Sequence, residues 1–234
     1  MKAAGEVRAR GTFARVGARA RLQRLTRGRL SRLEYAIRRA DHRAYVGGKW
    51  DEIGRLQLDF MIARGLRPED VFLDVACGSL RGGVHFIKYL DPGNYLGIDK
   101  ERTLVRRGAS RELPRAVRKQ KHPEFVISDA FEFERFSKRP QFSLAQSLFT
   151  HLVPEQIERC LANLLGFVPA GHDFYATFYP GESAANPASS DDFKRFAYSR
   201  EELSALAQRT GWNSDYIGDW GHPRGQLMMR FSAP

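Results

Sequence analysis

From Pro68 onward, short apolar segments alternate with helical stretches, and this alternation limits the available folds more than any other feature. Strands that alternate with helices indicate a parallel sheet covered by helices on both faces. Only residues 221–225 join the last two predicted strands, too few for a crossover helix, so the last strand should run antiparallel. We therefore predict a doubly wound, mostly parallel α/β sheet of seven strands with a C-terminal antiparallel hairpin. The predicted strands are 71–75, 95–98, 125–127, 142–148, 174–178, 216–220 and 226–231.

The helices expected between these strands carry recognisable start signals in two places. Pro154 suits the first turn of a helix over 154–165, because a proline nitrogen has no hydrogen to leave unpaired there. Ser199-Arg-Glu-Glu202 is a capping box, which predicts a helix that continues to about Thr210. Shorter helices are expected over 84–90 and 103–111.

Charge is distributed unevenly along the chain. Residues 1–43 hold 13 Lys and Arg but three Asp and Glu, whereas residues 44–234 hold 25 and 24. We therefore divide the chain into a basic arm, 1–43, and a nearly neutral domain, 44–234, whose charge argues against a wide nucleic-acid track. Apolar residues recur at helical spacing over 22–37, which fits a helix on the domain, an anchor at an anionic surface, or a contact with a partner such as a second copy.

Cysteine content and hydropathy exclude several other classes of protein. Cys77 and Cys160 cannot form a disulfide framework or a four-ligand zinc site. No apolar run approaches the roughly 18 residues that a membrane-spanning helix needs, and the N-terminus lacks the apolar stretch of a secretion signal. We therefore expect a soluble, cytoplasmic protein.

The turn after the first predicted strand reads Asp74-Val-Ala-Cys-Gly78-Ser-Leu-Arg81-Gly-Gly. Ligands of open α/β sheets bind outside the carboxyl ends of the strands, where this turn lies. If Ala76 and Gly78 match the first glycines of a dinucleotide-binding motif, Arg81 occupies the third position, which requires a small residue. This mismatch argues against NAD or FAD, and no Walker A motif is present.

Acidic residues end three successive predicted strands. Asp74 ends the first, Asp99 the second and Asp129 follows the third. Asp99 comes 21 positions after Gly78, a spacing that suits a carboxylate accepting hydrogen bonds from ribose hydroxyls. Each acid alone is more often a turn residue or helix cap, but three at one sheet edge indicate a binding site.

These segments resemble the class I S-adenosylmethionine-dependent methyltransferases over roughly residues 65–234. The resemblance implies that S-adenosylmethionine is the cofactor, and that a helix over 51–64, with Trp50 and Gln57, covers it. Ser143 and Gly171-His172 depart from the family pattern of a strand-four acid and a Gly-Gly pair. The residues that the resemblance assigns to the cofactor are Asp74, Ala76, Gly78, Asp99, Lys100, Asp129, Ala130 and Gln146.

Catalytic and acceptor residues are expected at the same edge of the sheet. His151 follows the fourth strand and is our candidate general base, with a packing or capping role as the alternative. The loop 180–192 is a candidate lid. The side chains expected to face the acceptor are Tyr179, Trp220, His222 and Arg224.

The acceptor is less constrained than the cofactor. The adenine-amino methyltransferases have Asp or Asn, then Pro-Pro and an aromatic residue after strand four, where this chain has Ser147-Leu-Phe-Thr. The Pro-Cys of cytosine-C5 enzymes is also absent from the sequence. The segments Gly-Ser-Leu-Arg-Gly-Gly at 78–83 and Ser-Leu-Phe-Thr-His-Leu at 147–152 resemble those of bacterial enzymes of glycan or secondary-metabolite synthesis. This resemblance implies O-methylation of a sugar or another small hydroxylated acceptor. An RNA methyltransferase that uses the basic arm, and a non-catalytic cofactor-binding protein, remain alternatives. Mg²⁺ assists some sugar O-methyltransferases, and Asp191, Asp192 or Glu155 could serve as ligands, but no spacing specifies a metal site.

Overall fold

The computed structural model describes residues 41–234. The basic arm expected over 1–43 therefore lies outside the described residues except for its last three positions. The helical spacing over 22–37, and the partner contact inferred from it, also lie outside them.

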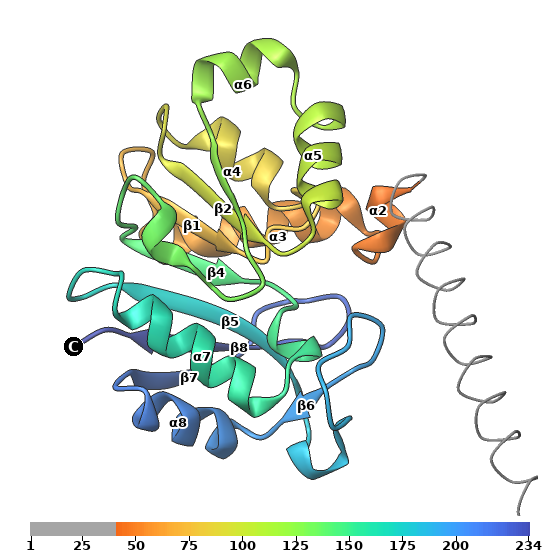
Figure 1. The fold of residues 1–234 in the computed structure, drawn as a ribbon, viewed down its shortest axis with the longest axis vertical. Helices are drawn as coiled ribbons and strands as arrows, with labels where there is room; N and C mark the ends of the chain where they lie inside the picture. The colour runs from red at the N-terminus through yellow and green to blue at the C-terminus, as the bar shows by residue number, and fades with distance from the viewer. Residues whose placement is uncertain (1–40) are drawn as a thin grey trace, which may run out of the picture.

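One mixed sheet runs through the molecule in the order β3-β2-β1-β4-β5-β8-β7 (Figure 1). The pairs among β1 to β5 are parallel, and β8 is antiparallel to both β5 and β7, which confirms the predicted fold class. An additional two-residue strand, β6, pairs with the end of β5. The strands are β1 Phe72–Val75, β2 Tyr95–Asp99, β3 Glu124–Ile127, β4 Phe142–Ala145, β5 Asp173–Pro180, β6 Ala197–Tyr198, β7 Asn213–Asp219 and β8 Leu227–Ser232.

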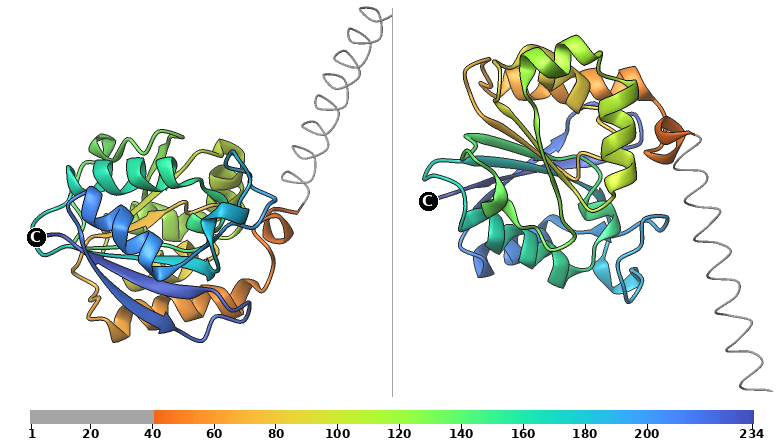
Figure 2. Two further views of the ribbon diagram at one scale, coloured as in Figure 1. Left: turned by 90° about the horizontal axis from the view of Figure 1, so that it is seen from below. Right: turned by 45° about the horizontal axis from the view of Figure 1, so that its top comes forward.

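Helices cover both faces of the sheet (Figure 2). The apolar side chains of α7 and α8 pack in one core, and those of α3, α4 and α5 pack in a second core on the opposite face. Successive β1 residues alternate between these cores, with Phe72 in one and Leu73 in the other, so the strand is buried throughout. The helices are α2 His42–Tyr45, α3 Trp50–Ala63, α4 Gly83–Tyr89, α5 Arg102–Arg111, α6 Arg115–Lys121, α7 Pro154–Leu165 and α8 Arg200–Arg209, with 3-10 turns η1 Phe133–Arg135, η2 Phe149–His151 and η3 Ser183–Ala185.

Helix α6 has no counterpart among the sequence predictions. Its seven residues, Arg-Ala-Val-Arg-Lys-Gln-Lys, hold a single large apolar side chain, Val117, so they show no apolar periodicity. Pro114 precedes the helix, and Val117 packs on the edge of the second core. Tertiary contact thus supports a helix that the local pattern does not indicate.

The strand order places the functional edge of the sheet. The chain moves outward from β1 to β2 and β3, then returns to the other side of β1 with β4. The loops that follow β1 and β4 therefore diverge in opposite directions, and a crevice forms outside the carboxyl ends of these strands. Strand β7 is parallel to β5, so the hairpin 220–226 lies at the same edge, as predicted.

Candidate active site

A cavity of about 740 Å³ lies at this edge, a size typical of small-molecule sites. The loops after β1, β2, β3 and β4 all contribute to its wall, together with residues 45–47 and part of the segment 190–193. Every predicted cofactor residue lines the cavity, and so do His151 and Arg224. The structure therefore brings together residues that are spread over 180 positions of the sequence.

The turn after β1 has an unusual backbone that allows close approach to the cavity. Ala76, Gly78 and Leu80 have φ of +63°, +54° and +69°. A Cβ atom built on Gly78 would lie 3.2 Å from Cγ1 of Val46, so a side chain there has little room. Positive φ at non-glycine residues is strained, and such strain clusters at functional sites.

Asp99 connects this turn to the end of β2. Its two carboxylate oxygens accept hydrogen bonds from the backbone N–H of Gly78, at 2.8 Å, and of Glu101, at 2.7 Å. Burial raises the pKa of Asp99 to about 6, although both hydrogen bonds act in the opposite direction. The carboxylate is therefore held in one orientation, and its remaining lone pairs are available to hydroxyl donors in the cavity.

Asp74 is a buried carboxyl group in the cavity wall, 5% exposed. The Tyr95 hydroxyl donates to its Oδ2 at 2.7 Å. Burial raises the pKa of Asp74 to about 7, while the Tyr95 hydrogen bond lowers it. A cationic ligand would favour the ionised form of such a group, and the group would in turn bind the cation.

Arg81 is a buried cation that also lines the cavity. Its Nη1 donates to the carbonyl oxygens of Val46, at 2.8 Å, and Gly48, at 3.1 Å, and its Nη2 donates to Oε1 of Gln146. Its Nε is buried and has no hydrogen-bond partner among the described residues. Burial, together with the neighbouring Arg224, lowers the pKa of Arg81 to about 10. The position of Arg81 in the turn after β1 argues against dinucleotide binding, and the structure shows in addition that its side chain lines the cavity.

His151 ends η2 and faces the cavity with its ring fixed by two carbonyl groups. Nδ1 lies 3.2 Å from the carbonyl oxygen of Asp191 and 3.0 Å from that of Lys194. A carbonyl oxygen only accepts hydrogen bonds, so these contacts require a proton on Nδ1. The neutral ring then has its lone pair on Nε2, the form that a general base needs.

The four residues expected around the acceptor separate into two groups. Arg224 lines the cavity, and its Nη2 donates to the carbonyl oxygen of Gly47. Trp220 and His222 are buried outside the cavity lining and stack on each other with ring centroids 5.3 Å apart. Burial lowers the pKa of His222 to about 4. Tyr179 also lies outside the lining, under the guanidinium of Arg195, whose Cζ is 3.6 Å from the ring centroid.

Two residues that the sequence analysis did not single out cover the cavity. Tyr45 and Phe193 both line it, and their rings meet edge to face, with centroids 5.9 Å apart. Beside them Nζ of Lys100 donates to Oδ1 of Asp192 at 2.6 Å. The expected cover helix α3 contributes Gln57 to the lining, whereas the segment before it, 45–47, contributes three residues. Of the candidate lid 180–192, only its last part lines the cavity, at Ser190 and Asp192.

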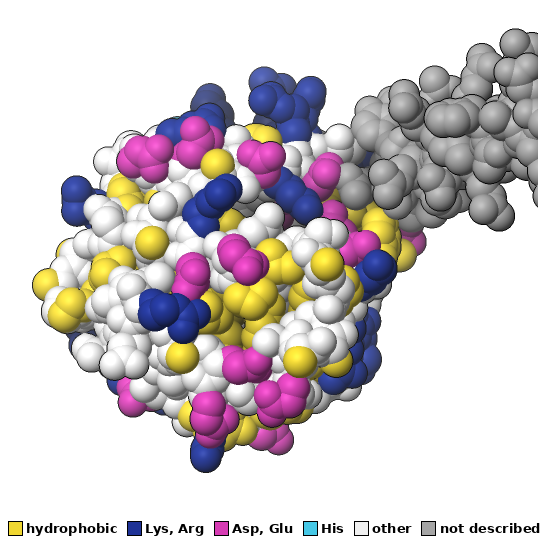
Figure 3. All heavy atoms as spheres, turned by 60° about the horizontal axis from the view of Figure 1, so that its bottom comes forward, with side chains coloured by type: hydrophobic (Ala, Val, Ile, Leu, Met, Phe, Trp, Pro, Cys, Tyr) yellow, Lys and Arg dark blue, Asp and Glu magenta, His cyan; other side chains and the backbone are white. Residues whose placement is uncertain are grey.

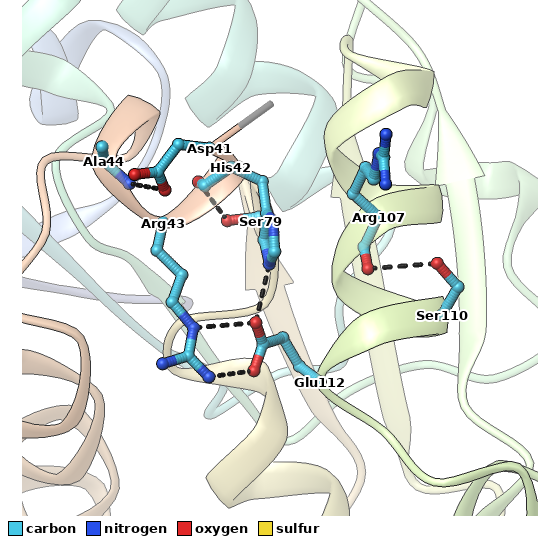
Figure 4. A network of polar contacts seen from close by, with 8 residues as sticks. All are labelled: Asp41, His42, Arg43, Ala44, Ser79, Arg107, Ser110 and Glu112. Atoms are coloured by element: carbon cyan, nitrogen blue, oxygen red, sulfur yellow. Dashed lines mark hydrogen bonds and ion pairs between the residues drawn. The ribbon is translucent and has the colours of Figure 1, made fainter. Parts of the chain in front are cut away.

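The segment that precedes α3 is attached to the domain by polar contacts (Figure 4). Glu112, just after α5, accepts hydrogen bonds from His42 at 2.7 Å and from Nε of Arg43 at 2.8 Å. The Ser79 hydroxyl donates to the carbonyl oxygen of His42 at 3.0 Å. These contacts place residues 45–47 over the turn after β1.

Within residues 41–234, no three His, Cys, Asp or Glu side chains are grouped so that they could hold a metal ion. The same part of the chain contains no helix long and apolar enough to span a membrane.

The chain has the fold of the S-adenosylmethionine-dependent methyltransferases. It is similar to magnesium protoporphyrin IX methyltransferase (ChlM) from Synechocystis PCC 6803 with bound SAM, with a TM-score of 0.62 and 12% identity over 85% of this chain and 94% of that chain. It is also similar to the glycopeptide N-methyltransferase MtfA, with a TM-score of 0.60 and 14% identity over 77% and 90% of the two chains. Streptomyces venezuelae DesVI matches with a TM-score of 0.59 and 15% identity over 81% and 95%. No protein-family profile matches the sequence.

Proposed function

We propose that this protein is an S-adenosylmethionine-dependent methyltransferase that methylates a hydroxyl oxygen of a sugar or another small hydroxylated acceptor. The observation that carries the proposal is the set of complementary groups around one cavity. Asp74 suits an ammonium group, Asp99 suits a ribose diol, and the unpartnered Nε of Arg81 suits a carboxylate. An amino acid joined to a nucleoside presents all three.

The cavity residues fit this cofactor in two further respects. Gly78 lines the cavity and carries no Cβ, so a ligand can approach its backbone closely. Asp129 and Ala130 also line the cavity, and the resemblance to the methyltransferases implies that they contact the adenine of the cofactor. When bound, the cofactor supplies an activated methyl group on a sulfonium.

The residues of this chain have two tasks in the proposed reaction. The groups around the cavity orient the two substrates for in-line transfer, in which the acceptor oxygen–carbon bond forms as the carbon–sulfur bond breaks. His151 accepts the proton of the acceptor hydroxyl at Nε2 and retains the Nδ1 proton through the carbonyl groups of Asp191 and Lys194. Arg224 at the cavity wall is a donor to acceptor oxygens.

Substitution of His151 tests the proposal. A screen of hydroxylated acceptors with labelled methyl donor identifies a substrate, and His151→Gln should then lower kcat about 10²–10⁴-fold. Calorimetry should show unchanged affinity for S-adenosylhomocysteine. Gln156→Ala, which removes a different polar side chain of the cavity lining, is the matched control and should retain most activity.

Two results would contradict the proposal at different levels. If the kcat of His151→Gln is within a few-fold of the wild-type value, His151 is not the general base. If the protein has no measurable affinity for S-adenosylmethionine or S-adenosylhomocysteine, the proposed methyltransferase function is wrong. The cavity would then bind a different ligand.

A ribose hydroxyl of RNA is the second candidate acceptor. It is supported by the charge of α5 and α6, since residues 102–121 contain eight Lys and Arg and one acidic residue.

A further inference from the structure

Positive charge is concentrated in one continuous segment of the domain. Residues 102–121, which include α5 and α6, contain eight Lys and Arg and one acid, Glu112. The rest of residues 44–234 contains 17 Lys and Arg against 23 Asp and Glu. The near-neutral charge of the domain is therefore an average over a strongly basic segment and an acidic remainder. The net charge of the domain therefore does not exclude nucleic-acid binding at this segment.

Helices α5 and α6 form one end of the molecule (Figures 1 and 2). The side chains of Arg102, Arg106, Arg111, Arg115 and Lys119 are exposed there. Among the described residues, none of these five takes part in an ion pair. Glu112, the acid of this segment, is already bound by His42 and Arg43, while Arg107 projects from α5 away from it (Figure 4). The basic charge of this end is therefore not neutralised by neighbouring carboxylates.

The helix α8 and the face that Figure 3 shows provide a contrast. Arg209 of α8 pairs with Glu158 at 2.5 Å, and Arg200 pairs with Glu201 at 2.5 Å. On that face, basic and acidic side chains are interspersed around apolar ones (Figure 3). Arg55, Arg64 and Arg159 are also exposed without an ion pair among the described residues, so unpaired charge alone does not distinguish α5 and α6. Their distinguishing property is the concentration of eight Lys and Arg beside one acid within residues 102–121.

A hollow of about 570 Å³ lies beside the basic helices. It is lined by Ala109, Arg118, His122, Pro123, Glu124 and Phe125. The rings of His122 and Phe125 in this lining provide stacking surface for a base. The carboxylate of Glu124, which also lines the hollow, already accepts hydrogen bonds from Ser137. Phosphate contacts are left to the exposed Arg and Lys of α5 and α6.

We propose that α5, α6 and this hollow form a docking surface for single-stranded RNA. Six of the eight basic residues are arginine, whose planar fork binds phosphate oxygens in pairs. Arg102 and Arg106 lie four residues apart, about one helical turn, and therefore share one side of α5. Arg107 and Arg111 form a second pair with the same spacing. The proposal concerns binding and does not depend on the methyl transfer proposed above.

Two observations favour RNA over an anionic membrane. The exposed large hydrophobic residues of the described chain, Ile62, Phe193 and Tyr216, all lie outside α5 and α6, so these helices offer no apolar side chain for insertion. In addition, Glu101 and Leu104 at the start of α5 line the main cavity, so a strand bound along α5 would pass its mouth. Residues 1–40, with 12 Lys and Arg against two Glu, join the domain at Asp41, beside the Glu112 contacts.

The test measures RNA binding by the full chain at several salt concentrations. The variant Arg106→Gln/Arg111→Gln/Arg115→Gln removes three exposed charges outside the cavity lining and outside the Glu112 contacts. Arg55→Gln/Arg200→Gln/Arg209→Gln removes three exposed charges elsewhere and is the matched control. The probe is a short single-stranded RNA of mixed sequence. We expect the first variant to bind about tenfold or more weakly at ~0.1 M salt, with the slope of log K against log salt reduced by about 2.

The control variant should retain the affinity and the salt slope of the wild type. Equal losses in the two variants would overturn the proposal, because general charge would then explain binding. Unchanged RNA binding in the first variant would also overturn it. If the first variant lost binding to phosphatidylglycerol vesicles but kept RNA binding, the surface would be a membrane site instead. Circular dichroism and S-adenosylhomocysteine binding establish that both variants are folded.

Discussion

Gly78 lies in the turn after β1 and lines the cavity with backbone alone. Its φ of +54° lies in the left-handed region, and its N–H is held by Asp99. Ala76 and Leu80 share that conformation although they carry side chains, at a cost of about 1–2 kcal/mol each. The positive φ values therefore destabilise the turn, but they leave its backbone accessible to a ligand.

We predict that Gly78→Ala weakens binding of S-adenosylhomocysteine about tenfold or more, because the methyl group occupies the space that the ligand needs. Calorimetry measures the effect. The added methyl would also lie 3.2 Å from Cγ1 of Val46, so the double variant Gly78→Ala/Val46→Ala separates the two contacts. Affinity should remain low in the double variant. Recovery of affinity would instead mean that Gly78 acts through the position of segment 45–47.

At the scale of elements, the starts of β4 and β5 are joined by a buried polar pair. Ser143 Oγ lies 2.7 Å from Nε2 of His172, and Nδ1 of His172 lies 2.8 Å from the carbonyl oxygen of Pro140. The carbonyl oxygen requires a proton on Nδ1, so Nε2 accepts a hydrogen bond from the Ser143 hydroxyl. These are the two positions at which the sequence departs from the family pattern. The structure shows them in direct contact, so each departure supplies the partner of the other.

His172 should make stability depend on pH. Burial lowers the pKa of His172 to about 4 from an ordinary value of 6.5. Below pH 6.5 the unfolded chain therefore binds a proton that the folded chain does not, and the stability of the fold falls until about pH 4. Relative to His172→Gln, the wild type should lose about 3 kcal/mol over this range, measured by urea unfolding. Asp74 and Asp99 titrate in both proteins and cancel in the difference. A difference that is constant with pH would contradict the assignment.

At the scale of the whole molecule, the cavity joins segments that are far apart in sequence. Arg224 in the hairpin 220–226 donates to Gly47, 177 positions earlier, and Arg81 donates to the same segment at Val46 and Gly48. Two separate cores on the two faces of the sheet hold the loops that these contacts connect. A ligand in the cavity would add contacts to both halves of the sheet.

We predict that S-adenosylhomocysteine raises the melting temperature of the whole domain. At about 100 times its Kd a ligand of the folded state adds about 2.7 kcal/mol, which corresponds to about 5–10 °C for a domain of this size. Differential scanning calorimetry measures the shift, and Asp99→Asn should reduce it. NADH is the comparison ligand and should have no effect, because Arg81 occupies the third position of the dinucleotide motif. A larger shift with NADH would contradict the proposed cofactor.

The alternation of strands and helices predicted the sheet, its antiparallel end and the edge at which Asp74, Asp99 and Asp129 meet. This was possible because parallel strands must end at a common edge, so residues at strand ends come together whatever the details of packing. His151 reached the same cavity for the same reason. Helix α6 could not be predicted from the sequence, because the packing of Val117 on the second core stabilises it and no local apolar pattern marks it.

The amino-acid sequence by itself determined which residues end the strands and therefore which could share a site. Only the tertiary structure decided which side chains face the cavity: Arg81 and Tyr45 do, while Tyr179, Trp220 and His222 do not line it. It also decided that the basic residues of 102–121 lie at one end of the molecule, where none of them forms an ion pair with an acid of residues 41–234. Both outcomes depend on contacts between residues distant in sequence, whereas periodicity and spacing report only on neighbours along the chain.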